Sequence, residues 1–262
     1  MRRKAGTAAF YLSSKIDWSD RVLASLTRRD VDADCVIVLG GRRHAGAAAR
    51  DMAKIGVPLI GVNLGTLGYL CELDKISVFP AIDKMFEDQF EVEDRMMLEG
   101  YSVSGQEKSE PTAAMNDIVI HRAGSAQIIN LVIRVGGEYL TTYSADGVII
   151  STPTGSTGYS MSAGGPIVDP KIKLLLITPV NPQSFSSRSI VVGADEQIEV
   201  MLAKRRPEQD EEAEVSFDGD RFVHMRIGDR LLVRKADVSA KVMKLNQLSF
   251  LQILRKKMQE YR

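Results

Sequence analysis

Short apolar runs alternate with amphipathic stretches in the first third of the chain. Cys35–Leu39 and Val57–Val62 are almost entirely apolar, which is typical of strands buried on both faces. The first run leads into Gly40-Gly41, and Ala45–Lys54 between the two runs has the small residues of a closely packed helix. Strand, glycine turn, helix and strand in this order predict a parallel α/β unit.

Helical spacing of apolar residues marks three further segments, at 17–26, 75–88 and 248–261. The last of them carries Leu251 and Leu254 beside a basic run. We expect this amphipathic terminal helix to return to the first domain.

From about Glu93 the pattern changes to short alternating or β-branched runs, separated by Gly, Asp and Asn turns. Such runs are typical of an antiparallel β domain. The sequence therefore predicts a Rossmann-like α/β domain at 1–92 plus 243–262 and a mostly antiparallel β domain at 93–242. The charged segment Lys204–Glu214 is expected to be a solvated loop.

Charge and cysteine content narrow the class of protein. Lys plus Arg and Asp plus Glu are both 34, so the net charge is zero and gives no sign of nucleic-acid or anionic-membrane binding. Cys35 and Cys71 lack metal-ligand spacing, and so low a cysteine count suits a reducing cytosol. No apolar segment has the length of a signal-peptide core after the basic amino terminus, or the about 18 residues of a membrane span. We expect a soluble cytoplasmic protein.

The segment Asp146–Pro166 carries the most distinctive chemistry of the chain. Val148–Ile150 predicts a strand, and the loop Ser151–Ser162 that follows has eight hydroxyl side chains interspersed with glycines. Hydroxyls and open backbone N–H groups can bind phosphates, riboses or amides, although the composition would equally suit a surface turn. A second turn, 63–68, follows the second buried strand, and open parallel sheets bind ligands at such strand ends.

Several segments, in the order in which they occur, resemble the bacterial NAD kinase family. They are 62–70 (VNLGTLGYL), 115–122 (MNDIVIHR), 146–166, 188–192 (RSIVV), 217–220 (FDGD) and 250–257 (FLQILRKK). The resemblance implies a two-domain kinase that transfers the γ-phosphoryl group of ATP, or of polyphosphate in some members, to the 2′-hydroxyl of the adenosine ribose of NAD. It further implies a site between the domains and a homodimer or homotetramer. Phosphoryl transfer also calls for a divalent metal such as Mg²⁺ to neutralise phosphate charge. The zero net charge gives no reason to expect a nucleic-acid or membrane partner.

The resemblance also implies roles for particular residues. Asn116 and Asp117 would hydrogen-bond the ribose, a task that suits a carboxylate because it accepts from both ribose hydroxyls. Asp146 would contact the nicotinamide end. From the residues alone, Asn116-Asp117 and Asp146 could instead be turn positions beside strands. The implied NAD pocket comprises Thr154, Thr157, Gly158, Tyr159, Ser160, Met161 and Ser162, with the Tyr159 ring near the adenine or, alternatively, in the core. The implied ATP turn comprises Gly40, Gly41, Arg43, His44, Asn63, Gly65 and Thr66, and no residue is assigned as a metal ligand.

The family's Gly-Gly-Asp-Gly-Thr element is broken in this chain. Gly40-Gly41 is present, but Arg42, Arg43 and His44 follow it. The family's aspartate is the proposed base toward the 2′-hydroxyl, and Arg42 cannot replace it because a guanidinium stays protonated. His44 could titrate near neutral pH, yet it lies two positions further on. General-base help contributes typically about 10²–10⁴-fold, so Arg42 predicts an impaired enzyme, although two arginines could still hold phosphate.

A local frameshift is an alternative origin for residues 42–47. If the ancestral codons were GGC GAC GGC ACG, one extra C after the glycine codon gives CGA CGG CAC, which encodes the Arg-Arg-His found at 42–44. A compensating deletion would restore the frame before Ala48, because the downstream segments match in register. The nucleotides of the gene decide this point, since codons that lack a shifted GAC-GGC-AC would reject the hypothesis.

Three functions remain open on the sequence. They are an NAD 2′-kinase, a non-catalytic NAD(P)-binding protein that keeps the pocket without the base, and a lipid or sphingoid kinase of the diacylglycerol-kinase fold. Against the lipid kinase, Asn116-Asp117 and the 154–162 loop match the dinucleotide branch, and no membrane-binding face is evident.

Other polar residues have simpler interpretations. His121 and His224 alternate with apolar neighbours and are expected to be structural histidines with satisfied hydrogen bonds. Asp218-Gly219-Asp220 is typical of a hairpin turn, though relatives place it near the site. Ser144 stands where many relatives carry a basic residue, so no ligand contact is expected there.

Overall fold

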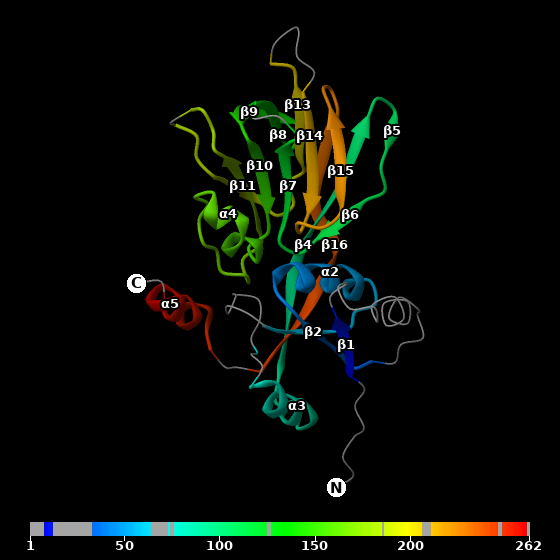
Figure 1. The fold of residues 1–262 in the computed structure, drawn as a ribbon, viewed down its shortest axis with the longest axis vertical. Coiled ribbons are helices and arrows are strands. Elements are labelled where there is room, and N and C mark those ends of the chain that lie inside the picture. The colour runs from blue at the N-terminus through cyan, green and yellow to red at the C-terminus, as the bar shows by residue number, and fades with distance from the viewer. Residues whose placement is uncertain are drawn as a thin grey trace. The chain divides into compact units, whose positions relative to one another are not determined.

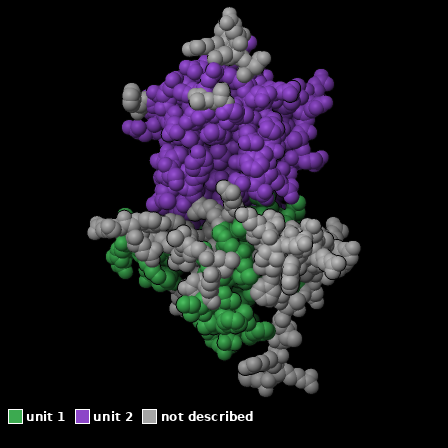
Figure 2. Space-filling model, viewed as in Figure 1, with its two compact units in different colours: residues 1–95, 240–262 green, residues 96–239 purple. Residues whose placement is uncertain are grey.

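The computed structural model describes residues 8–12, 33–63, 73, 76–124, 127–184, 186–205, 211–245 and 248–260. The side chains of residues 8–12, 42, 43, 257 and 260 lie outside this description, as does the helix expected at 17–26. The chain forms two compact units, Met1–Arg95 with Ala240–Arg262 and Met96–Ser239, which are coloured separately in Figure 2. Two long strands, β4 (Glu91–Ser104) and β16 (Arg230–Lys244), have residues in both units.

The first unit contains a parallel sheet, as the alternation of apolar runs predicts. Its strands are β1 (Ala8–Leu12), β2 (Cys35–Leu39) and β3 (Leu59–Val62), and the end of β16 pairs with β3 through Val242 and Leu59 (Figure 1). Every residue of β3 is buried, and so are the first four of β2, which is the burial that continuous apolar strands of a parallel sheet require.

Three helices belong to the described part of this unit. α2 (Arg42–Ala53) contacts the sheet strands, and its small residues explain why, because Ala45, Ala48, Ala49 and Met52 form one buried stripe at helical spacing. α3 (Val78–Phe86) packs Ala81, Ile82 and Met85 against the core that contains Ile37 and Ile60. α5 (Phe250–Glu260) is part of the first unit as well, with Ile253 and Leu254 half-buried.

The second unit consists of antiparallel sheets. One sheet has the order β12-β11-β10-β7-β14-β15, and its strands are β7 (Asp117–Arg122), β10 (Gly147–Ser151), β11 (Leu174–Val180), β12 (Ile190–Gly193), β14 (Glu212–Phe217) and β15 (Phe222–Arg226). In the other, β16 pairs with β13 (Ile198–Ala203), followed by β8 (Ile129–Val135) and β9 (Glu138–Ala145). β4 pairs with β16 and with the short strands β5 (Glu107–Lys108) and β6 (Thr112–Ala114).

One expectation about this unit was wrong. The end of the charged segment Lys204–Glu214 is not a loop, because β14 begins at Glu212 and pairs with β7, which buries Ala213 and Val215. His224 lies on the exposed side of β15, and its role as a structural histidine stays a prediction. His121 does have a partner, since its Nδ1 lies 2.9 Å from the carbonyl oxygen of Arg122.

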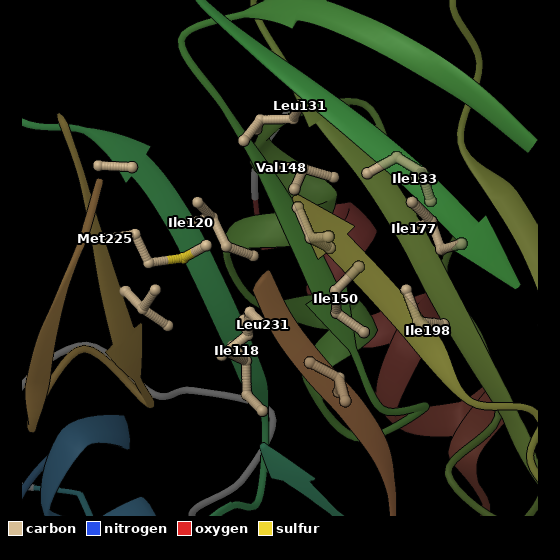
Figure 3. Packing of buried hydrophobic residues seen from close by; sticks show 14 of the residues in the cluster. Ile118, Ile120, Leu131, Ile133, Val148, Ile150, Ile177, Ile198, Met225 and Leu231 are labelled. Atoms are coloured by element: carbon tan, nitrogen blue, oxygen red, sulfur yellow. The ribbon is translucent and has the colours of Figure 1, made fainter. Parts of the chain in front are cut away.

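Alternation along the strands decides which side chains form the core of the second unit. Ile118 and Ile120 of β7 and Val148 and Ile150 of β10 lie in one buried cluster with side chains of the other sheet, such as Leu131. Figure 3 shows these side chains pointing toward one another. The alternate residues on each strand, among them Asp117 on β7 and Ser151 on β10, therefore face the opposite side of their sheet.

The opposite side of the six-stranded sheet is covered by the segment that follows β10. This segment contains a short 3₁₀ helix, η1 (Gly155–Thr157), and a single-turn helix, α4 (Tyr159–Ser162). Val119, Ile149 and Val180 form a small apolar cluster on this side, against which Ala163 packs. The hydroxyl-rich loop is thus fixed on the sheet face that also bears Asp117.

Candidate functional site

The candidate site of the second unit lies where β7 begins and β10 ends. The two strands are antiparallel with Ser151 opposite Asp117, so the residues before β7 and after β10 are neighbours. Asn116 and Asp117 are 1% and 7% exposed. The two motifs that the sequence singles out thus meet at one edge of the sheet.

The start of the hydroxyl-rich loop is bonded to the backbone before Asp117. The Thr152 N–H donates to the Asn116 carbonyl oxygen at 2.9 Å, and the Thr152 hydroxyl donates to that of Met115 at 2.7 Å. The same hydroxyl accepts from the Gly155 N–H at 2.9 Å. A Cβ on Gly155 would overlap the Asn116 carbonyl oxygen and lie 2.8 Å from its Cα, so only glycine permits this close approach.

The other side of the Asn116 backbone is held by Asp218. One carboxylate oxygen accepts from the Asn116 N–H at 2.7 Å and from the Asp117 N–H at 3.3 Å, and the other accepts from the Met115 N–H at 2.9 Å. The Asp218 N–H in turn donates to the Asp117 carbonyl oxygen at 3.0 Å. Asp218 is 6% exposed, so these contacts are shielded from water.

The polar atoms of the Asn116 side chain are a second feature of this site. Its amide oxygen and amide nitrogen are both buried, and neither has a hydrogen-bond partner among the described residues. The hydroxyl of Ser151, which is fully buried, is in the same state. Buried polar groups without partners are rare and costly, and such a group in a native fold calls for an explanation. Asn116 and Ser151 are therefore candidate contacts for a ligand with hydrogen-bonding groups.

The predicted pocket residues of the loop differ in their exposure. Ser160 is fully buried and its hydroxyl lies 3.0 Å from that of Thr178, while Thr154 and Thr157 are 4% and 7% exposed. Tyr159, Met161 and Ser162 are exposed. Tyr159, Met161 and Ser162 therefore offer surface to a ligand, whereas the Ser160 hydroxyl ties α4 to β11.

Asp146 precedes β10 and is already engaged by two side chains. Arg122 Nε donates to one carboxylate oxygen at 2.9 Å, and the Asn181 amide donates to the other at 3.0 Å. These hydrogen bonds, that of Asn181 first, hold the pKa of Asp146 below its usual value. Ser144, just upstream, donates to the Asn130 side chain at 2.7 Å.

The glycine turn of the first unit ends β2 and begins α2. Gly40 has φ 149°, and a Cβ there would overlap Nδ1 of His44, so the imidazole ring packs against this glycine. Nδ1 of His44 is buried without a partner among the described residues. Asn63 at the end of β3 is buried, whereas Gly65 and Thr66 lie outside the described residues.

Neither a membrane span nor a resident metal cluster is found in the described part of the chain. No helix in it is long and apolar enough to cross a membrane. No three His, Cys, Asp or Glu side chains in it are close enough to hold a metal ion.

Sequence reasoning did not assign three residues to the site, namely Ser151, Thr152 and Asp218. Asp218 was expected to be a hairpin turn, and it does begin the turn between β14 and β15, with φ 54° at Asp218 and 68° at Gly219. Its second role was hidden because its partners precede it by about a hundred residues. The signal available for Thr152 was its place directly after a buried strand.

Comparison with known proteins identifies the class. Two family models match, the ATP-NAD kinase N-terminal domain over residues 4–90 and the ATP-NAD kinase C-terminal domain over residues 115–245. The NAD kinase of Agathobacter rectalis is 48% identical over 261 residues, covering 100% of this chain and 91% of that protein. The NAD kinase of Lachnoclostridium phytofermentans is 43% identical, covering 86% of this chain and 80% of that protein.

Solved structures agree with this result. Yeast NADH kinase complexed with NADH superposes with a TM-score of 0.80 at 26% identity, covering 87% of this chain and 67% of that chain. The NAD kinase of Archaeoglobus fulgidus in complex with ATP has a TM-score of 0.75 at 23% identity, covering 97% of this chain and 99% of that chain, and supports the fold. Fold and matches together define a kinase with an α/β unit and a β-rich unit. The chain belongs to the NAD kinase family. The resemblance drawn from the sequence is confirmed, and the lipid-kinase alternative receives no support.

Proposed function

We propose that this chain transfers the γ-phosphoryl group of ATP to the 2′-hydroxyl of the adenosine ribose of NAD, which yields NADP. The observation that carries the proposal is the buried Asn116 amide beside Asp117, at the meeting point of the two family motifs, for which the described part of the chain offers no hydrogen-bond partner. Relatives of this chain are NAD kinases, and two solved relatives contain NADH or ATP.

The ribose is the part of NAD that Asn116 and Asp117 suit. An amide offers both a donor and an acceptor, and a carboxylate accepts from two hydroxyls at once. The carboxylate of Asp117 accepts hydrogen bonds from the ribose hydroxyls and so orients the ribose. The Asn116 amide makes its hydrogen bonds to atoms of the ligand. Because both groups sit on a backbone that is bonded on two sides, they hold the 2′-hydroxyl in one position, which is the main requirement of phosphoryl transfer.

The hydroxyl-rich loop supplies the rest of the dinucleotide pocket in this proposal. Tyr159 presents an exposed aromatic face for the adenine, and Met161 adds apolar surface. The rest of the pocket that the family resemblance implies consists of Thr154, Thr157, Gly158, Ser160 and Ser162. Ser160 contributes by its hydrogen bond to Thr178, which ties α4 to β11. Asp146 keeps acceptor capacity for the nicotinamide amide, because an ionised carboxylate can accept about four hydrogen bonds.

The triphosphate is assigned to the glycine turn between β2 and α2 and to residues that follow β3 in the sequence. The proposed ATP-binding residues are Gly40, Gly41, Arg43, His44, Asn63, Gly65 and Thr66. The start of α2 at Arg42 favours negative charge, because unpaired N–H groups gather at a helix N-terminus. Mg²⁺ usually binds through phosphates, water and only one or two carboxylates, so it would accompany ATP rather than occupy a cluster of protein ligands.

Because Arg42 stands where the family has its aspartate base, the rate of NADP formation is the measurement that tests the proposed activity. Purified protein is incubated with NAD, ATP and magnesium, and NADP is measured with an NADP-specific dehydrogenase. We expect slow turnover by the natural chain. The triple variant Arg42→Asp, Arg43→Gly, His44→Thr should be faster by about 10²–10⁴-fold, the usual contribution of a general base.

A matched variant separates gaining a carboxylate from losing a guanidinium. Arg42→Asn with the same changes at 43 and 44 removes the positive charge but supplies no base, and it should stay slow. Equal rates for the two triple variants would refute the assignment of position 42. A chain that binds NAD but makes no NADP in any variant would instead be a non-catalytic NAD-binding protein.

Donor and assembly are open to direct measurement in the same preparation. Replacing ATP by polyphosphate, or NAD by NADH, defines the substrates. We also propose a homodimer or homotetramer in the cytoplasm, and light scattering of the purified protein checks the assembly.

A further inference from the structure

Asp218 has more contacts than a hairpin turn requires. A β-turn whose two central residues are left-handed, as Asp218 and Gly219 are here, needs only Asn, Asp or Gly at the first of them, because these tolerate positive φ. Such a turn is normally exposed, and Gly219 and Asp220 are exposed here, but Asp218 is 6% exposed. Its side chain reaches back to three consecutive backbone N–H groups, at residues 115, 116 and 117.

A carboxylate matches this group of donors better than any other side chain. It has two oxygens, it accepts only, and its negative charge strengthens each bond. An asparagine in the same place would direct its NH₂ group toward backbone N–H groups and leave at least one of them unpaired. The identity of the residue is thus set by the segment Met115–Asp117 rather than by the turn.

The bonds of Asp218 determine where two side chains of the site point. The directions of the Cα–Cβ bonds of Asn116 and Asp117 follow from the backbone between them, and Asp218 and Thr152 fix that backbone from two sides. The Asn116 amide itself makes no hydrogen bond to the described protein, so its orientation depends on packing and on this backbone.

We propose that Asp218 is a positioning residue for the dinucleotide, which keeps Asn116 and Asp117 in the geometry that binds the ribose. This inference rests on the proposed function, in which those two residues contact NAD. Asp218 acts through the backbone and touches no substrate. Its loss therefore weakens NAD binding and leaves ATP binding unchanged.

The test is equilibrium binding of NAD and of ATP, measured by calorimetry on the full chain. Asp218→Asn keeps the size of the side chain and tolerates positive φ, so it removes the carboxylate with little effect on the turn. We expect its dissociation constant for NAD to rise by about 10- to 100-fold, the usual effect of losing a charge-assisted hydrogen bond, while that for ATP stays within about twofold. Asp220→Asn, in the same turn but exposed, is the matched control and should bind both ligands as the natural chain does.

A double-mutant cycle with Asn116→Ala distinguishes positioning from general stability. If Asp218 acts through Asn116, Asp218→Asn should add much less to the loss of NAD affinity in the Asn116→Ala background than it does alone. Fully additive losses, or unchanged NAD affinity in Asp218→Asn, would overturn the positioning role while leaving the proposed function intact. Absence of NAD binding by the natural chain would overturn the proposed function and this role with it.

A second variant keeps the proposal testable if Asp218→Asn does not fold. Asp218→Glu retains the charge but makes the side chain longer by one methylene group. Its carboxylate therefore no longer fits the position in which it accepts from all three N–H groups. Circular dichroism should show that this variant is folded, and calorimetry should show that it binds NAD more weakly than the natural chain does. A folded Asp218→Glu protein with natural NAD affinity would contradict the proposal.

Discussion

Replacing Gly155 by alanine is the sharpest test of how the candidate site is built. The glycine has no positive φ, so alanine meets no backbone strain there and the effect is purely one of space. An added Cβ would overlap the carbonyl oxygen of Asn116 and lie 2.5 Å from its carbonyl carbon and 2.8 Å from its Cα. These are backbone atoms, which cannot rotate away as a flexible side chain can.

The size of the effect follows from the distances. Carbon–carbon contacts settle at about 3.5–4.0 Å, so the loop and the Asn116 backbone must separate by roughly 1 Å. Overpacking of this kind costs about 1–3 kcal/mol. The same movement stretches the bond from Thr152 N–H to Asn116 and the bond from the Thr152 hydroxyl to Met115, each worth about 0.5–1.5 kcal/mol. Alanine also lowers the conformational entropy of the unfolded chain, which restores about 0.4–1 kcal/mol of stability. The net loss in the free energy of unfolding is therefore roughly 3 kcal/mol.

Urea unfolding followed by circular dichroism measures this loss. With a slope of about 2 kcal/mol per molar urea, the midpoint should fall by roughly 1.5 M. NAD affinity should fall too, because the Asn116 backbone moves. Gly193→Ala is the matched control, since its Cβ would meet only the Glu196 side chain at 3.9 Å, and its stability should change by less than about 0.5 kcal/mol. A Gly155→Ala protein with the natural midpoint and natural NAD affinity would refute the close packing of this loop on Asn116.

Two further predictions concern ionisable groups. Hydrogen bonds from Asn181 and Arg122 lower the pKa of folded Asp146, so its stabilisation is present above its unfolded pKa of about 4 and is lost as the pH falls through the folded value. The difference in urea stability between the natural chain and Asp146→Asn should therefore shrink between pH 7 and pH 3, and a difference that is constant over this range would contradict the assignment. Cys35 is buried and its pKa is raised to about 11 by that burial, with a smaller contribution from Asp34. In a Cys71→Ser background a thiol reagent at pH 8 should label no thiol in the native protein and one in urea, whereas native labelling would show that Cys35 is accessible.

Local pattern predicted most of the longer elements of the fold, but it missed β1 in the weakly patterned amino-terminal segment and the short helices η1 and α4. Continuous apolar runs identified β2 and β3, the small residues after Gly41 identified α2, and β-branched runs identified β7 and β10. These predictions succeeded because burial gives each element its own pattern of apolar residues, and that pattern is visible within a few residues of chain. The end of the charged segment before β14 shows the limit of this reasoning, since pairing with β7 outweighed the preference of charged residues for loops.

Sequence alone determined the α/β and β-rich architecture, the family, and Asn116 and Asp117 as candidate ribose ligands. Only the tertiary structure decided how these two residues are held, because the Asp218 carboxylate bonds to an N–H group 103 positions earlier in the chain. It also decided that Ser160 bonds to another side chain while the Asn116 amide finds no partner among the residues that the structure describes, although both are polar residues in matching motifs. The physical reason is that a hydrogen bond depends on distance and direction in space, and neither is encoded in the spacing of two residues along the chain.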